Sequence, residues 1–120
     1  MRHRNKLKKL SRPSDARKAL INNLMIQVFE HGSVMTTVQK AKAVKPFIER
    51  LISKGKKGDL SARRYINSYV HNKKLTNKVV DEISKKYVSR PGGYTRILKL
   101  GQRRGDAAEM AIFQLVKEAE

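Results

Sequence analysis

The stretch GGYTRILKLGQRRGDAAEMAI, residues 92–112, decides the fold, because the pattern of the chain changes here from helical to strand-like. Pro91-Gly92-Gly93 is a strong turn signal that ends the helical part. The segment YTRILKL (94–100) is rich in residues that favour strands, and it predicts one. The segment GQRRGD (101–106) then reads as a basic loop bounded by glycines. We therefore expect the C-terminal part of the chain to contain a strand followed by an exposed basic loop.

The segment after this loop, AAEMAIFQLV (107–116), is ambiguous. Its Ala, Glu, Met and Leu content favours a helix. Its position after a strand and a glycine-bounded loop, as in a hairpin, favours a second strand. Residue propensity alone predicts a helix by a small margin, and both alternatives stay open at this point.

Working back towards the N-terminus, the chain shows apolar residues at helical spacing. The first helix begins near Ser14, a good N-cap residue, and Gly32 is placed to end it in a left-handed conformation. Its apolar positions are Leu20, Ile21, Leu24, Met25 and Val28. The β-branched stretch SVMTT (33–37) then predicts a short strand.

Three further helices are predicted between residues 36 and 88. Thr36 and Gln39 form a T-x-x-Q capping box for the first of them, and Pro46 inside it predicts a kink. Asp59 can cap the next helix after the break GKKGD (55–59), and HNKK (71–74) is a second break. Their expected buried positions are Ala41, Val44, Ile48, Leu51 and Ile52, then Ala62, Tyr65 or Ile66, Tyr69 and Val70, then Leu75, Val79, Ile83 and Tyr87.

The composition indicates a polyanionic partner. The chain has 120 residues, which suits one domain, and a formal net charge of +18. It lacks cysteine, which excludes disulfides and thiolate metal sites and fits a cytosolic protein. It has no secretory signal and no apolar run of the roughly 20 residues that span a bilayer. An anionic membrane surface is the rival of nucleic acid, but the chain has no Trp and its basic residues concentrate in loops and at the N-terminus.

The N-terminal arm, residues 1–12, is strongly basic, and we expect residues 13–120 to form a single globular domain. Residues 1–18 contain eight Arg or Lys against Asp15 alone. Such a block of like charge is solvated in the free protein, and it can also fold on a polyanion.

Catalysis has little support in the sequence. His3, His31 and His71 are far apart and fit no metal-ligand spacing. Asp106 and Glu109 allow a hypothesis of a metal-dependent nuclease, but carboxylates beside arginines are more often ion pairs. The segment GQRRGDA also lacks the G-K-[ST] ending of a phosphate-binding loop.

Two basic loops are candidates for nucleic-acid contact. The segment GKKG (55–58) resembles the G-x-x-G loop of KH domains, but a helix C-terminus with exposed lysines is the favoured interpretation. Tyr94 can stack on a base, while a half-buried core position is slightly favoured for it. Lys56, Lys57, Arg63 and Arg64 form one basic cluster, and Arg96, Lys99, Arg103 and Arg104 form the other.

Five stretches carry a resemblance to a known family. They are the opening MRHRNKLKKLSR, FEHGSVMTT (29–37), AKAVKPFIERLI (41–52), KKGDLSARR (56–64) and the final GGYTRILKLGQRRGDAAEMAI. In this order they make the chain similar to bacterial ribosomal protein seventeen of the large (50S) subunit. Residues 65–91 match least. Gly55 stands where Ala is expected, which could end the second helix earlier, and Gln114 stands where Glu is usual.

The resemblance implies an α+β fold, a two-layer α/β domain with helices packed on a small three-stranded sheet in the order α-β-α-α-α-β-β. Residues 107–116 would then be a strand, and we adopt that expectation. It also implies a cytoplasmic ribosomal protein that binds large-subunit ribosomal RNA and neighbouring ribosomal proteins, with no cofactor, no small-molecule substrate and no catalysis. A DNA-compacting protein is the alternative, although no helix-turn-helix is evident. The expected RNA-binding residues are Arg2, His3, Arg4, Lys6, Lys8, Lys9, Arg12, Arg17, Lys56, Lys57, Arg63, Arg64, Tyr94, Arg96, Arg103 and Arg104.

Overall fold

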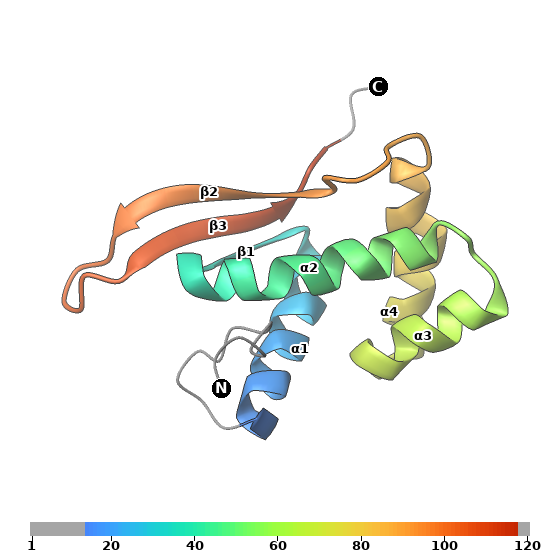
Figure 1. Cartoon of the computed structure of the whole chain (residues 1–120), viewed down its shortest axis with the longest axis horizontal. Helices are drawn as coiled ribbons and strands as arrows, with labels where there is room; N and C mark the ends of the chain where they lie inside the picture. Colours follow the sequence, from blue (N-terminus) through green and yellow to red (C-terminus); the bar gives the residue numbers. More distant parts are fainter. Residues whose placement is uncertain (1–13, 118–120) are drawn as a thin grey trace, which may run out of the picture.

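A computed structural model describes residues 14–117 (Figure 1). The element order is the expected α-β-α-α-α-β-β, so the predicted fold class is confirmed. The elements are α1 (Ser14–His31), β1 (Ser33–Thr37), α2 (Val38–Gly55), α3 (Leu60–Val70), α4 (Lys73–Lys78), β2 (Thr95–Gln102) and β3 (Glu109–Leu115). A π-helical turn, η2 (Val79–Ile83), and a 3₁₀ turn, η3 (Ser84–Tyr87), continue α4. The arm of residues 1–12 lies outside the described residues.

The sheet is antiparallel and has the order β1-β3-β2. The helix that propensity predicted for 107–116 is therefore wrong, and the strand that the resemblance implied is confirmed. The physical reason is tertiary: β3 is the central strand, so its backbone groups are paired on both sides. Ala111 and Phe113 on this strand are fully buried.

The end of α1 follows the predicted glycine signal. Gly32 has a φ of +85°, and its N–H donates to the carbonyl of Val28 at 2.7 Å. A left-handed residue at this position suits glycine, because it has no Cβ to clash with the backbone. The chain then turns directly into β1.

The N-terminus of α2 lies one residue later than predicted. Thr37, not Thr36, is the N-cap, and its hydroxyl accepts from the N–H of Lys40 at 3.3 Å. Thr36 is instead a buried strand residue that pairs with Ala111. The pairing of β1 with β3 holds Thr36 in the sheet, so the helix can begin only after it.

α2 ends where the sequence placed a break. It runs through Pro46 to Gly55, the first residue of the segment GKKGD, so the predicted break is confirmed. Gly55 is buried where α2 meets the chain after α4, and a Cβ at this position would lie 2.2 Å from Oγ of Ser84. Close packing therefore explains a glycine here.

The core lies between the helices and one face of the sheet. All the apolar positions predicted on α2 are buried, and so are Ala62, Ile66 and Val70 of α3, whereas Tyr65 and Tyr69 are half-buried. Leu75, Val79, Ile83 and Tyr87 are buried as predicted, although they belong to a composite helix. The opposite face of the sheet carries exposed apolar residues, including Met35 at 66% exposure and Leu98 at 41%.

The β2–β3 hairpin extends beyond the helices (Figure 1). Its register shifts by one residue between Lys99 and Gly101, which is a β-bulge that leaves Leu100 exposed. The turn of the hairpin carries Arg103 and Arg104, so the loop that the sequence marked as basic lies far from the helical body.

Candidate nucleic-acid interface

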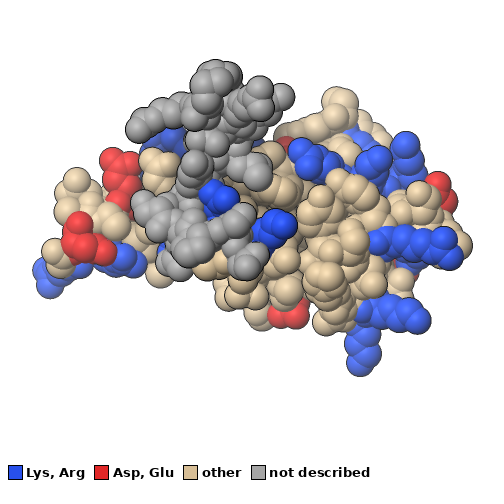
Figure 2. All heavy atoms as spheres, turned by 60° about the horizontal axis from the view of Figure 1, so that its bottom comes forward, with Lys and Arg blue, Asp and Glu red and all other residues tan. Residues whose placement is uncertain are grey.

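Figure 2 shows Lys and Arg side chains gathered over the end of the molecule that holds α3 and α4, and others at the hairpin tip. Acidic side chains are scattered among them, and several have partners within the chain. Glu49 accepts from the N–H of Tyr94, Asp59 caps α3, Asp81 pairs with Arg63, and Asp106 pairs with Arg103. These four carboxylates thus have local roles, and most of the exposed cations between residues 14 and 117 form no ion pair with an acid in that range.

Lys56 and Tyr94 lie together inside this surface. The ammonium of Lys56 donates to the phenolic oxygen of Tyr94 at 2.8 Å and to the carbonyl of Arg90 at 2.6 Å. Tyr94 is 2% exposed, so its ring cannot stack on a base, and the core alternative holds for it. Burial raises the pKa of Tyr94, but hydrogen bonds from Lys56 and Ser53 outweigh it and leave the pKa below its ordinary value.

The neighbouring cations of the first basic cluster face different surroundings. Lys57 and Arg64 are exposed. Arg63 is half-buried and donates to Asn77 and to Asp81, each at 2.8 Å. The hydrogen bond from Arg63 lowers the pKa of Asp81. The structure therefore does not present the four residues of this cluster as one uniform patch, and Lys57 and Arg64 are its accessible members.

The hairpin tip combines a paired and an unpaired arginine. Arg103 donates to both carboxylate oxygens of Asp106, at 2.6 and 3.2 Å, while Arg104 is exposed and forms no ion pair within residues 14–117. Hydrogen bonds from Arg103 and from the N–H of Ala108 lower the pKa of Asp106 to about 2. Asp106 thus forms an ion pair with Arg103. This is the interpretation that the sequence analysis favoured over a nuclease site.

Arg96 and Arg17 complete the described part of the predicted set. Arg96 is exposed on β2, and its guanidinium lies 2.7 Å from the side-chain amide of Gln114. Arg17 is half-buried on α1 and has an interaction within the chain. The remaining predicted residues, Arg2, His3, Arg4, Lys6, Lys8, Lys9 and Arg12, lie outside the described residues.

Sequence reasoning left out four exposed lysines of the helical end. Lys73 and Lys74 open α4, and Lys85 and Lys86 lie in η3. A signal was available, because Lys73 and Lys74 directly precede the buried Leu75, and Lys85 and Lys86 lie between the buried Ile83 and Tyr87. In a helical pattern such positions point outward.

Other kinds of site lack support in the part of the chain that the structure covers. Between residues 14 and 117, no three His, Cys, Asp or Glu side chains lie close enough to hold a metal ion. Over the same range, no helix is both long and apolar enough to cross a bilayer.

Comparison with known proteins settles the family. Residues 20–116 match the family model described as Ribosomal protein L17. The chain belongs to the ribosomal protein L17 family. It is 51% identical to large ribosomal subunit protein bL17 of Petrotoga mobilis over the whole of both chains. It is 50% identical to that of Helicobacter hepaticus, with 97% of this chain and 100% of the other covered. With that of Kosmotoga olearia it shares 47% identity over 98% of this chain and 94% of the other.

Membership of the L17 family confirms the resemblance drawn from the sequence motifs. It makes the chain a non-enzymatic protein of the large ribosomal subunit, with a role in translation. The basic surface described above is therefore the surface of a ribosomal protein.

Proposed function

We propose that this protein is a structural constituent of the large subunit that binds and stabilises folded large-subunit ribosomal RNA. The observation that carries the proposal is the distribution of charge: Lys57, Arg64, Arg96 and Arg104 are exposed on separate elements, whereas the carboxylates nearby have partners within the chain. Cations spread over several elements can contact RNA segments that come together only in the folded RNA. The protein would act in the cytoplasmic ribosome, beside neighbouring ribosomal proteins.

The arm of residues 1–12 is the second part of the proposed RNA-binding surface, and residues 13–120 are the globular part that docks on the RNA. The arm contains six Arg or Lys and no acid. A segment of this composition orders when phosphates neutralise it, and threading into RNA supplies them. His3 adds a hydrogen-bonding ring to this cationic segment.

The mechanism is the release of condensed counterions from RNA. Log affinity falls as log salt concentration rises, and each phosphate contact makes this slope steeper by roughly 0.7–0.9. Phosphate contacts fix the position of a protein but carry no base sequence. Recognition of a particular RNA then comes from its shape and its 2′-hydroxyl groups. Lys56 and Tyr94 serve this function indirectly, because they hold together the elements that present Lys57 and Arg96.

The test compares binding of the full chain and of a variant lacking residues 1–12 to large-subunit RNA and to duplex DNA over a range of salt concentrations. We expect a strong preference for the folded RNA and a shallower salt slope after truncation. A variant carrying Arg64→Gln and Arg104→Gln should also bind more weakly with the arm intact. Equal affinity for RNA and duplex DNA would contradict the proposal and favour the DNA-compacting alternative.

A further inference from the structure

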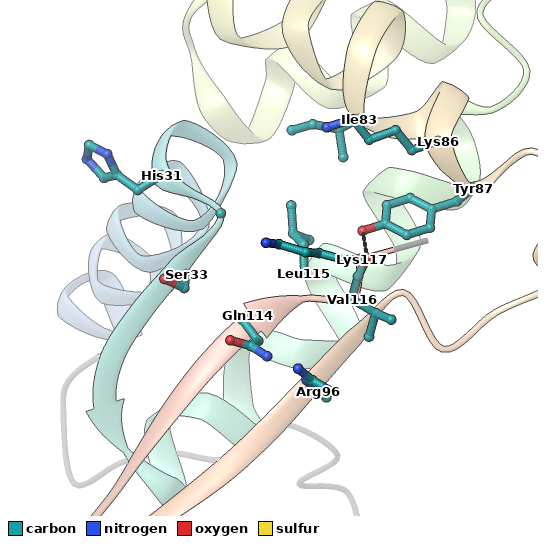
Figure 3. A pocket seen from close by; sticks show the side chains of 11 residues that line it. His31, Ser33, Ile83, Lys86, Tyr87, Arg96, Gln114, Leu115, Val116 and Lys117 are labelled. Carbon is teal, nitrogen blue, oxygen red and sulfur yellow. Dashed lines mark hydrogen bonds between the residues drawn. The ribbon is translucent and has the colours of Figure 1, made fainter. Parts of the chain in front are cut away.

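A groove of about 820 Å³ lies beside the end of the sheet, away from the hairpin tip (Figure 3). Its walls come from segments that are distant in sequence: the end of α1 with the start of β1, the η2–η3 turns, β2, and the end of β3. Arg96, which lines the groove, is six residues from Gln102 at the hairpin end of β2, or roughly 20 Å at about 3.3 Å per residue. The groove is thus a separate place from the basic hairpin tip.

Of the residues that the structure describes, three cations and no carboxylate line this groove. Lys86 reaches it from η3, Arg96 from β2 and Lys117 from just after β3, and in Figure 3 Lys86 and Lys117 extend into the space between the walls. His31 lies at the rim, with Glu30 3.8 Å from its ring outside the lining. Cations that converge from separate walls select a ligand with more than one negative charge.

The polar side chains in the groove fit the rest of a nucleotide backbone. Ser33 and Gln114 line the groove beside Arg96, and they form one row across the three strands. Hydroxyl and amide groups can bond to ribose 2′-hydroxyls, while Arg suits phosphate because its planar group offers several donors. Ile83 and Tyr87, which are both buried, line the groove from the η2–η3 turns on the side opposite the strands (Figure 3).

Hydrogen bonds hold the walls of the groove in place. The N–H of Leu115 donates to the carbonyl of Gly32 at 3.0 Å, and the N–H of Val116 donates to the carbonyl of Tyr94 at 2.8 Å. The hydroxyl of Tyr87 donates to the carbonyl of Val116, which joins η3 to the chain after β3. A groove fixed in this way loses little conformational freedom when it binds a ligand.

We propose that this groove holds the sugar–phosphate backbone of an RNA segment other than those bound by the arm and the hairpin tip. The inference rests on the proposed RNA-binding function and adds a site to it. The observations favour RNA over an acidic protein segment, because the groove combines three cations with groups suited to ribose on a chain whose exposed charge is basic elsewhere as well.

Matched charge removal tests the proposal. Lys86→Gln with Arg96→Gln removes two charges from the groove. Lys42→Gln with Lys54→Gln removes two charges from exposed positions on α2 that do not line it. Lys117 is left intact, because Glu118 and Glu120 follow it in the sequence. Circular dichroism and urea unfolding establish that both variants are folded.

The groove pair should lower affinity for large-subunit RNA about tenfold or more, and its salt slope should become shallower by about 1.4–1.8, the value for two lost phosphate contacts. The control pair should change the slope by less than half of that. Equal effects of the two pairs would overturn the groove proposal while leaving the proposed function intact. If the unaltered chain itself shows no preference for the RNA, the proposed function fails as well.

A cross-linking experiment identifies the kind of partner. The chain has no cysteine, so a photo-cross-linker on Lys86→Cys or Lys85→Cys reports from one position only. In reconstituted large subunits, the probe at position 86 should attach to RNA and do so more strongly than the probe at position 85. Attachment of the position-86 probe to protein alone would overturn the proposal and assign the groove to a neighbouring protein.

Discussion

The ammonium of Lys56 lies 2.8 Å from the phenolic oxygen of Tyr94 and 5.0 Å from the centre of its ring. Through this contact and the hydrogen bond to Arg90, Lys56 joins the end of α2 to the turn that leads into β2. A residue that the sequence marks as an RNA-binding lysine is thus a connection between the helical part and the sheet.

Substitution of Lys56 and of its neighbour Lys57 should have opposite consequences. Lys56→Met removes the donor that the oxygens of Tyr94 and Arg90 share, leaving Tyr94 only the hydrogen bond from Ser53, and we expect a loss of about 1–3 kcal/mol in the free energy of unfolding. Lys57→Met, at an exposed position, should change it by less than about 0.5 kcal/mol and weaken RNA binding instead. Urea unfolding and RNA titration separate the two effects, and equal losses of stability would refute this assignment.

Gly55 and Ser84 should be energetically coupled. A Cβ at position 55 would lie 2.2 Å from Oγ of Ser84, which donates to the carbonyl of Ile52. Gly55→Ala should therefore destabilise the protein by about 1–3 kcal/mol, although Ala is the better helix former. Ser84→Ala removes the clashing atom, so the double variant should be more stable than the sum of the single changes predicts. Additive changes in urea unfolding would show that the helix end shifts freely.

The hairpin tip should respond to acid through Asp106. Its pKa of about 2 is depressed, so the folded loop favours the charged carboxylate. The contribution of the ion pair is then fully present above the ordinary Asp pKa of about 3.9 and is lost as the pH falls through about 2. Carboxyl-carbon NMR can follow this titration. Arg103→Gln should raise the midpoint towards the ordinary value, whereas Arg104→Gln should leave it near about 2; a shift with both would point to general charge effects.

Neighbouring residues on β2 should show the difference between the two faces of the sheet. Ile97 packs against the core, while Leu98 is 41% exposed on the opposite face. We expect Ile97→Ala to cost about 2 kcal/mol and Leu98→Ala less than about 1 kcal/mol. Thermal or urea unfolding measures both. A larger loss at Leu98 would mean that the outer face of the sheet is covered in the free protein.

The sequence by itself determined the features that depend on local chemistry. The apolar spacing marked the buried faces of the helices, Gly32 marked the end of α1, and Asp59 marked the start of α3. The charge of the chain and its basic loops indicated a polyanionic partner, and the family motifs indicated the kind of polyanion. These signals can be read locally because each depends on residues within a turn or two of one another.

Only the tertiary structure decided what depends on distant partners. Residues 109–115 form a strand against their own helix propensity, because β1 and β2 pair with both of their edges. Lys56 turns inward because Tyr94 and the carbonyl of Arg90 lie within its reach, and Lys86, Arg96 and Lys117 share a groove because the fold brings their elements together. Strand pairing and side-chain packing between residues far apart in the sequence outweigh helix propensities, which differ by less than about 1 kcal/mol per residue. No local sequence pattern indicates these long-range contacts.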